Sequence, residues 1–113
     1  MATNFEDKLR LLKGPHRKCS TVTAAYTATL DDDIIVAAGA AGAFALTLPP
    51  AADAYDSATG TSHVFTVINN DTDDCTVTPD GAETINGAAT LVLDVQYEWC
   101  QLFTDGTEWY ALV

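Results

Sequence analysis

The sequence predicts an all-β protein, an antiparallel β-sandwich that follows a short N-terminal helix and an extended arm. From Thr21 onward, short runs of alternating apolar and polar residues are separated by turn residues at regular intervals, which is typical of a sandwich or barrel. At 113 residues, 48% of them apolar, the chain suits one domain with a single core. The strand order stays open between jelly-roll-like and immunoglobulin-like. We therefore expect an arm over residues 1–20 and a β domain over residues 21–113.

The first fourteen residues carry the signals of one short amphipathic helix. Thr3 followed by Glu6 fits a capping box at its start, and Gly14 followed by Pro15 ends it. Three apolar side chains recur at helical spacing along one stripe, namely Phe5, Leu9 and Leu12. A helix of about ten residues is marginal in water by itself, so it must pack on its own body, a sister subunit or another protein. Residues 15–20 then form an extended connector.

The β domain is expected to contain about seven or eight strands, bounded by turns rich in Gly, Pro, Asn and Asp. The expected strands cover residues 21–30, 34–38, 44–48, 64–69, 75–78, 91–95, 98–104 and 108–113. A further short run at residues 83–85 precedes a turn centred on Gly87. The longest loop is expected over residues 51–61. Asp105 and Gly106 predict a tight type I′ hairpin between the last two strands, because both residues tolerate a positive φ.

Large aromatic residues gather near the end of the chain, where two adjacent strands can place them as cross-strand pairs. They are Tyr97, Trp99, Phe103, Trp109 and Tyr110. We expect most of them to form the core of the sandwich. Trp109 and Tyr110 are adjacent and must point to opposite faces of a regular strand, so one of them is expected outside that core. An outward aromatic is a candidate contact for a subunit or a host surface.

Charge is divided sharply along the chain, whose net charge is −11 at pH 7. All five Lys and Arg residues lie within residues 1–18, which also hold two acids, while residues 19–113 hold fourteen acids and no Lys or Arg. The arm is therefore near +3 and the body near −14. Such a body repels phosphate backbones, which argues against nucleic-acid binding. No apolar run approaches the roughly 20 residues of a membrane span, and the N-terminus lacks a secretory signal, so we expect a protein that starts in the cytosol.

The sequence shows no pattern that predicts catalysis, a metal centre or a cofactor. Its three cysteines form no Cys-x-x-Cys pair, so reduced, buried thiols are expected. They are Cys19, Cys75 and Cys100. The two histidines, His16 and His63, belong to no catalytic motif. The acidic runs at residues 31–33 and 71–74 are interpreted as solvated turns, with a weak divalent-cation site as the alternative. We conclude that the protein is not an enzyme and needs no cofactor.

Six short motifs succeed one another along the β domain. They are Tyr26-Thr27-Ala28, Phe44-Ala45-Leu46-Thr47-Leu48-Pro49, Phe65-Thr66-Val67-Ile68-Asn69-Asn70, Val77-Thr78-Pro79, Glu83-Thr84-Ile85-Asn86-Gly87 and Asp105-Gly106-Thr107-Glu108-Trp109. Their order and spacing resemble a β-structural domain of tailed-bacteriophage virion proteins, which occurs in tail fibres and in capsid decoration proteins. The match covers about residues 21–113. The resemblance implies an antiparallel β-sandwich, often trimeric, without catalysis.

A short chain with a basic, helix-bearing arm departs from a typical fibre protein and favours a capsid decoration, or cement, protein. The resemblance then implies a structural virion protein, a homotrimer on the outer surface of the capsid, assembled in the host cytoplasm. It would bind the major capsid protein at capsomer junctions and stabilise the head, with neither nucleic acid nor membrane as a partner. The expected capsid and subunit contacts lie in the arm, at Phe5, Lys8, Leu9, Arg10, Leu12, Lys13, Arg17 and Lys18.

Two other functions stay open. The first is a tail-fibre or receptor-binding β-module that contacts host surface glycans through outward aromatic side chains. The second is a host-directed accessory protein that binds a cytosolic target.

Overall fold

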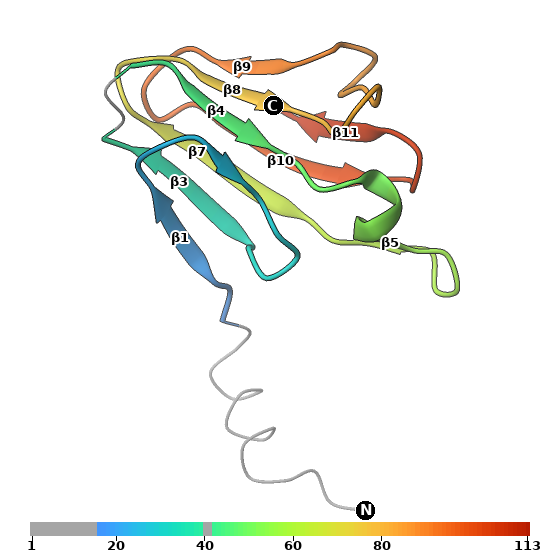
Figure 1. The fold of residues 1–113 in the computed structure, drawn as a ribbon. Helices are drawn as coiled ribbons and strands as arrows, with labels where there is room; N and C mark the ends of the chain where they lie inside the picture. The colour runs from blue at the N-terminus through green and yellow to red at the C-terminus, as the bar shows by residue number, and fades with distance from the viewer. Residues whose placement is uncertain (1–15, 40–41) are drawn as a thin grey trace, which may run out of the picture.

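The computed structural model describes residues 16–39 and 42–113, and the regular elements in these ranges are β-strands and one short 3-10 helix (Figure 1). The elements are β1 (Cys19–Val22), β2 (Tyr26–Thr27), β3 (Ile34–Ala38), β4 (Phe44–Thr47), η1 (Ala51–Ala54), β5 (Tyr55–Asp56), β6 (Thr61–Ser62), β7 (Phe65–Asn70), β8 (Cys75–Thr78), β9 (Leu91–Leu93), β10 (Trp99–Thr104) and β11 (Trp109–Leu112). The predicted all-β class is confirmed. The helix predicted within the first fourteen residues lies outside the described residues.

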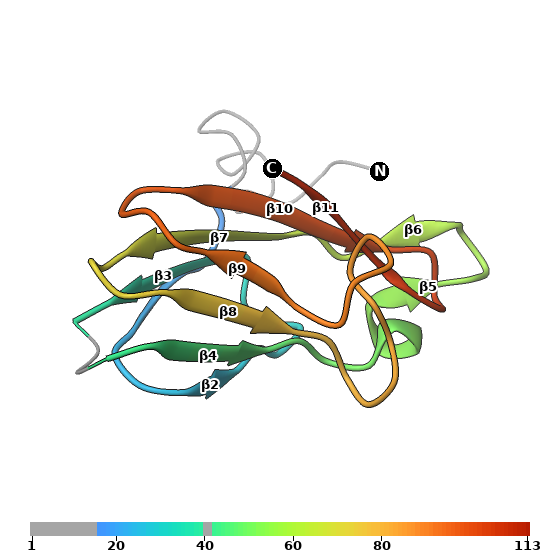
Figure 2. The same cartoon turned by 90° about the horizontal axis from the view of Figure 1, so that it is seen from above.

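The strands form two main sheets and a small hairpin. Sheet A has five strands in the order β1-β3-β7-β10-β11, and sheet B has four in the order β2-β4-β8-β9. Strands β5 and β6 pair with each other alone. Sheets A and B lie in two layers over a common interior (Figures 1 and 2). Alternate side chains of each strand point into this interior, as the period of two predicts.

In the first part of the chain, successive strands alternate between the two sheets, and neighbouring strands within each sheet are parallel. Strands β1, β3 and β7 lie in sheet A and pair in parallel, and β2, β4 and β8 do the same in sheet B. Ser20 faces Ile35 across one pair, and Ile35 faces Val67 across the next. Only β9, β10 and β11 close the sheets with antiparallel pairs.

The predicted antiparallel sandwich, whether jelly-roll-like or immunoglobulin-like, is therefore wrong for four strand pairs, β1–β3, β3–β7, β2–β4 and β4–β8, which are parallel. An antiparallel neighbour arises when the chain turns back beside the strand it has just left. Here the chain crosses to the other layer after β1, β2, β3 and β7, and after β4 by way of the β5–β6 hairpin, and it returns to each layer running in its original direction. Alternating apolar residues look the same in both arrangements, so the sequence pattern cannot distinguish them.

The same crossing divides the strand that was predicted over residues 21–30. Strand β1 already begins at Cys19 and pairs with β3, whereas β2 joins the other sheet. The predicted loop over residues 51–61 holds η1 and the start of the β5–β6 hairpin. The short run at residues 83–85 is not a strand, although Ile85 makes isolated bridges to Ala88 and Trp109.

The connection between β10 and β11 also differs from the prediction. It is four residues long, since Thr104 pairs with Trp109, and among these residues only Gly106 has a positive φ, of 95°. A two-residue type I′ turn would need Asp105 in the left-handed region as well. Instead, the Asp105 carboxylate accepts hydrogen bonds from the backbone N–H groups of Thr107 (2.9 Å) and Glu108 (3.0 Å). The carboxylate closes this turn by capping its backbone donors.

Both sheets contribute inward side chains to one core. Its largest fully buried members are Trp109, Phe65, Ile35, Leu46, Leu48, Ile85, Leu93, Leu102, Val67 and Val77. The prediction that most of the terminal aromatics form this core is wrong, because only Trp109 is buried and Trp99 and Tyr97 are 54% and 63% exposed. The prediction for the adjacent pair is confirmed, since Trp109 points inward and Tyr110 outward.

Two of the three cysteines are buried thiols, as predicted, and the third is not. Burial raises the pKa of Cys75 to about 11 and that of Cys100 to about 12, so both stay protonated at neutral pH. Cys19 is exposed on the edge strand β1. The described part of the chain holds no group of three or more His, Cys, Asp or Glu side chains placed to hold a metal ion. Its helical segments include none with the length and apolarity to cross a membrane.

Candidate interaction surface

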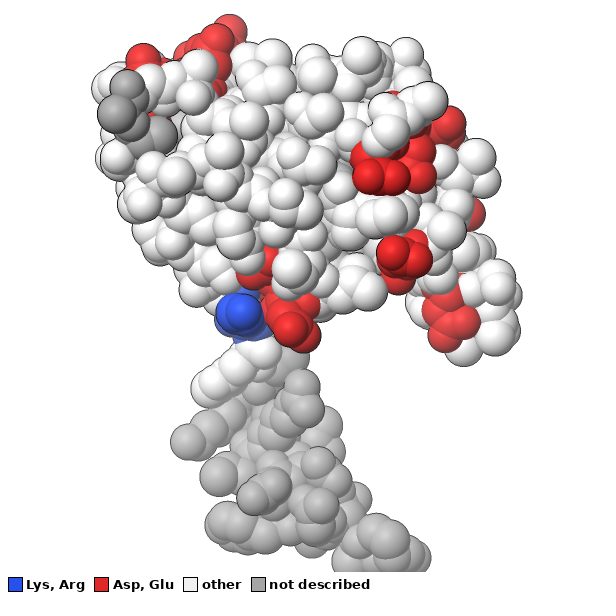
Figure 3. All heavy atoms as spheres, in the orientation of Figure 1, with Lys and Arg blue, Asp and Glu red and all other residues white. Residues whose placement is uncertain are grey.

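The basic arm joins the body at the start of β1, where an acidic turn fixes its last residue. The Lys18 N–H donates to Asp33 Oδ2 (3.1 Å), and the Lys18 carbonyl accepts from the Ile34 N–H (2.9 Å). The Lys18 ammonium lies 4.0 Å from Asp32 Oδ1 and stays 58% exposed. Figure 3 shows basic and acidic side chains side by side at this end of the body. The backbone of Lys18 is therefore anchored, and the arm starts from a defined point at the end of sheet A.

Asp32 is the centre of this anchor, because its carboxylate is fully buried and accepts hydrogen bonds from three residues. The donors are the Ser20 hydroxyl (2.8 Å), the Tyr26 hydroxyl (2.8 Å) and the Thr29 N–H (2.9 Å). Burial favours the neutral acid, but these hydrogen bonds and the Lys18 charge outweigh it and leave the pKa of Asp32 below its usual value. The anionic side chain thus ties β1 and β2 to the turn that precedes β3.

The predicted solvated turn at residues 31–33 is therefore partly buried. Asp32 points inward, and the Asp33 carboxylate accepts from the Lys18 N–H while lying 3.8 Å from His63 Nε2. The carboxylates of Asp32 and Asp33 accept hydrogen bonds from groups of the protein itself. Asp31 is exposed and is the side chain of this turn that is directed at solvent. The alternative of a cation site at this turn gains no support from this geometry.

Of the eight predicted contact residues, Arg17 and Lys18 fall within the described residues. The other six, Phe5, Lys8, Leu9, Arg10, Leu12 and Lys13, lie outside them. Lys18 contacts the acidic turn of its own body, so its charge is already partly matched. Arg17 is exposed and borders a groove of about 360 Å³, whose other lining residues are Asp33, Ile34, Val64, Thr66 and Gln101. This groove opens on the outer side of sheet A.

The outer side of sheet A carries no carboxylate, ammonium, guanidinium or imidazole group on its strands. Its outward residues are Cys19, Thr21, Ile34, Val36, Ala38, Thr66, Ile68, Asn70, Trp99, Gln101, Phe103, Tyr110 and Leu112. We call this set the apolar face. Trp99 and Leu112 are 54% and 59% exposed, and the Phe103 and Tyr110 rings stack with their centroids 5.8 Å apart. A contiguous exposed surface of this composition is typical of an interaction site.

The register brings the members of the apolar face into rows across the strands. One row runs through Thr21, Val36, Ile68 and Trp99. A second runs through Cys19, Ile34, Thr66, Gln101 and Leu112, and in it the Gln101 amide donates to the Thr66 hydroxyl (3.3 Å). The aromatic members of this face lie on β10 and β11, and both sides of β10 carry apolar residues, which explains why sequence reasoning placed these aromatics in the core.

The outer side of sheet B is different in character. Its outward residues are Thr27, Ala45, Thr47, Thr76, Thr78 and Val92. Hydroxyl groups dominate this surface, and Val92 is its one large exposed hydrophobic residue. The outer side of sheet A is therefore apolar and aromatic, and the outer side of sheet B is rich in hydroxyl groups. An exposed position on sheet B can serve as a control for a substitution on the apolar face.

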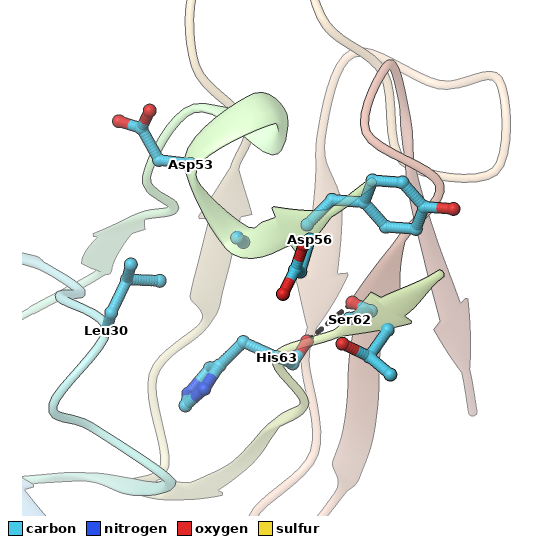
Figure 4. Close-up of a pocket in the computed structure, with 8 residues that line it drawn as sticks. Leu30, Asp53, Asp56, Ser62 and His63 are labelled. Carbon is cyan, nitrogen blue, oxygen red and sulfur yellow. Dashed lines mark hydrogen bonds between the residues drawn. The ribbon is translucent and has the colours of Figure 1, made fainter. Parts of the chain in front are cut away.

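A second depression, of about 250 Å³, lies near the β5–β6 hairpin and contains a serine beside a histidine (Figure 4). The His63 ring points away from Ser62, and its Nε2 atom is 2.6 Å from the Asp32 carbonyl oxygen. The Ser62 hydroxyl donates to the His63 carbonyl (2.7 Å) and accepts from the Thr104 N–H (2.9 Å). Both side chains are engaged by the backbone, and His63 does not act on the Ser62 hydroxyl as a general base would.

No protein-family model matches the chain, and no curated protein matches it either. The described residues define its class, an all-β protein with Lys18 anchored at the start of β1 and an uncharged, aromatic sheet face.

Proposed function

We propose that this protein is a structural virion protein, a decoration or cement protein that binds the outer surface of an assembled phage head at capsomer junctions and stabilises it. The observation that carries the proposal is the anchoring of Lys18 at the end of sheet A. Asp33 accepts a hydrogen bond from the Lys18 N–H, and Asp32 lies beside the Lys18 ammonium. We call this anchored residue the root of the arm. A fixed root lets a charged segment reach a neighbouring protein from a rigid body. The proposed partners are the major capsid protein and sister copies in a homotrimer.

In this proposal the arm makes the contacts that bind the protein to the shell. Phe5, Leu9 and Leu12 bury apolar area on the shell at about 25 cal/mol per Å². Lys8, Arg10, Lys13 and Arg17 face acidic groups of the capsid, which gives orientation and a faster encounter. Lys18, in contrast, belongs to the root, because its backbone and its ammonium both contact the acidic turn. Many such attachments repeated over a shell add stability through avidity.

A second function is favoured by the exposed aromatic side chains, namely a tail-fibre or receptor-binding module that contacts host surface glycans. Trp99 and Tyr97 offer flat rings that are more than half exposed. Binding of this kind would depend on those rings and not on the arm. A glycan array therefore separates the two functions, since hits that disappear in Trp99→Ala and persist without the arm favour the receptor-binding module.

Cosedimentation with undecorated heads of the phage that encodes the protein tests the proposed function. We expect the full chain to bind at 50 mM NaCl and to bind about three- to tenfold more weakly at 500 mM. Salt screens the exposed ion pairs over about 8 Å at physiological ionic strength and leaves the apolar contacts in place. Failure to cosediment at either salt concentration would contradict the proposal. Equal binding at both salt concentrations would show that the Lys and Arg residues of the arm do not contribute to attachment.

A further inference from the structure

We infer that the apolar face of sheet A is the surface through which copies of this chain associate with one another. The inference names the surface that would hold the proposed homotrimer together. It rests on the proposed function only for the number of copies that associate. Its test uses the purified protein alone, without shells, so that it stands or falls separately from attachment to a head.

The charge of the body selects a second copy as the occupant of this face. Residues 19–113 hold fourteen acids and no Lys or Arg, so most contacts between two bodies would bring carboxylates together. The apolar face is the side of sheet A from which those carboxylates are missing, because the acids stand in the turns at its ends. Asp105, for example, accepts a hydrogen bond from the Tyr110 hydroxyl (3.0 Å) at one end of the face. A basic partner, in contrast, would be drawn to the acidic turns and away from an uncharged surface.

The composition of the face agrees with a contact between proteins. Trp99 and Tyr110 are exposed, and aromatic residues are enriched at the centres of interfaces, where charged residues are depleted. Among the described residues, strand β1 at the edge of sheet A has no paired neighbour on its outer side, and the strands of the body contain no lysine to protect such edges. Association over the face would cover the exposed aromatic side chains.

The area of the face sets the expected strength. Five strands about 4.8 Å apart, each four to six residues long, give a surface of about 400 Å². Val64, 38% exposed, extends it at the end that borders the groove. Stable complexes bury about 800 Å² on each partner, so this smaller face predicts a weak association that depends on protein concentration.

Sedimentation equilibrium on the full chain from 10 to 300 µM, at 50 and 500 mM NaCl, tests the inference. We expect the average mass to rise above the 12.0 kDa of one chain with concentration, and association to tighten about three- to tenfold at the higher salt. Salt screens the repulsion between two acidic bodies, so its effect has the opposite sign from its effect on arm attachment.

Substitutions on the two sheets identify the surface. Trp99→Asp and Leu112→Asp place a charge on the apolar face and are expected to hold the mass at 12.0 kDa over the whole range. Val92→Asp, on the outer side of sheet B, is 43% exposed in the native protein and is the matched control, which should associate like the native chain. Because all three positions are exposed, far-ultraviolet circular dichroism and thermal unfolding should show a native fold in each variant.

Several outcomes would overturn the inference. If the average mass of the native chain stays at 12.0 kDa at every protein concentration and at both salt concentrations, the chain does not self-associate and the inference is wrong. Dissociation by Val92→Asp but not by Trp99→Asp would place the contact on sheet B. Association that weakens at 500 mM NaCl would indicate that the basic arm holds the acidic bodies together, and the apolar face would lose its role.

Discussion

Deletion of residues 1–15 is expected to lower the shell-bound fraction by about 100-fold or more while the β domain stays folded. A factor of 100 corresponds to about 2.8 kcal/mol, which burial of about 110 Å² of apolar surface by the stripe of the arm supplies. The truncated chain keeps Lys18 and its hydrogen bond to Asp33, and β1 begins only at Cys19. Its melting temperature should therefore stay within a few degrees of that of the full chain, as measured by circular dichroism.

Two variants of the full chain separate the apolar stripe from the rest of the arm. Replacing Phe5, Leu9 and Leu12 by Ala should reproduce most of the loss seen on truncation. Replacing Asn4 and Asp7, which the predicted helix would place off that stripe, by Ala is the matched control and should leave attachment within about threefold of the native level. Truncated protein that occupies shells as fully as the native chain would refute the role of the arm.

Replacement of Asp32 by Ala is expected to lower the free energy of unfolding by about 3–5 kcal/mol, the largest effect on stability that we predict for a single polar residue. The change removes a fully buried carboxylate and leaves the donors of Ser20, Tyr26 and Thr29 without their acceptor. Urea unfolding followed by fluorescence measures the difference. Asp31→Ala in the same turn is the control, because Asp31 is exposed, and it should change stability by less than about 0.5 kcal/mol.

The effect of Asp32 should depend on pH with a definite sign. Its pKa in the folded protein is lowered, so the anion stabilises the fold above the ordinary pKa near 3.8, and this stabilisation is lost as the pH falls through the lowered value. The difference in stability between native protein and Asp32→Ala should therefore be full at pH 7 and shrink below about pH 4. A difference under 1 kcal/mol at pH 7 would show that the network around Asp32 does not hold β1 in place.

The positions of most strands could be predicted because inward and outward residues alternate along them. Strands β3 and β8 lie at the predicted residues, and β10 differs by one residue. The direction of pairing could not be predicted, because a period of two is common to parallel and antiparallel strands. Only the fold shows that the chain crosses between layers after Val22 and again after Ala38.

The interaction surface was partly hidden by the same periodicity. In β10, Trp99 and Phe103 share one side with Gln101, while Cys100 and Leu102 share the other, so both sides read as apolar. Gln101 was the signal that the Trp99 side faces solvent. The role of Asp32 had no local signal, since a run of three aspartates is typical of an exposed turn. Its donors Ser20 and Tyr26 come from other strands, and only the fold brings them to it.

The most direct test of the proposed function is the copy number of this chain on purified virions. Quantitative mass spectrometry of particles, before and after mild surface proteolysis, measures both its abundance and its exposure. A decoration protein should be present in copies comparable in number to the capsomer junctions and should be removed by the protease from the outside of the head. Absence of the chain from particles, or its recovery only with detached tail fibres, would contradict the proposal.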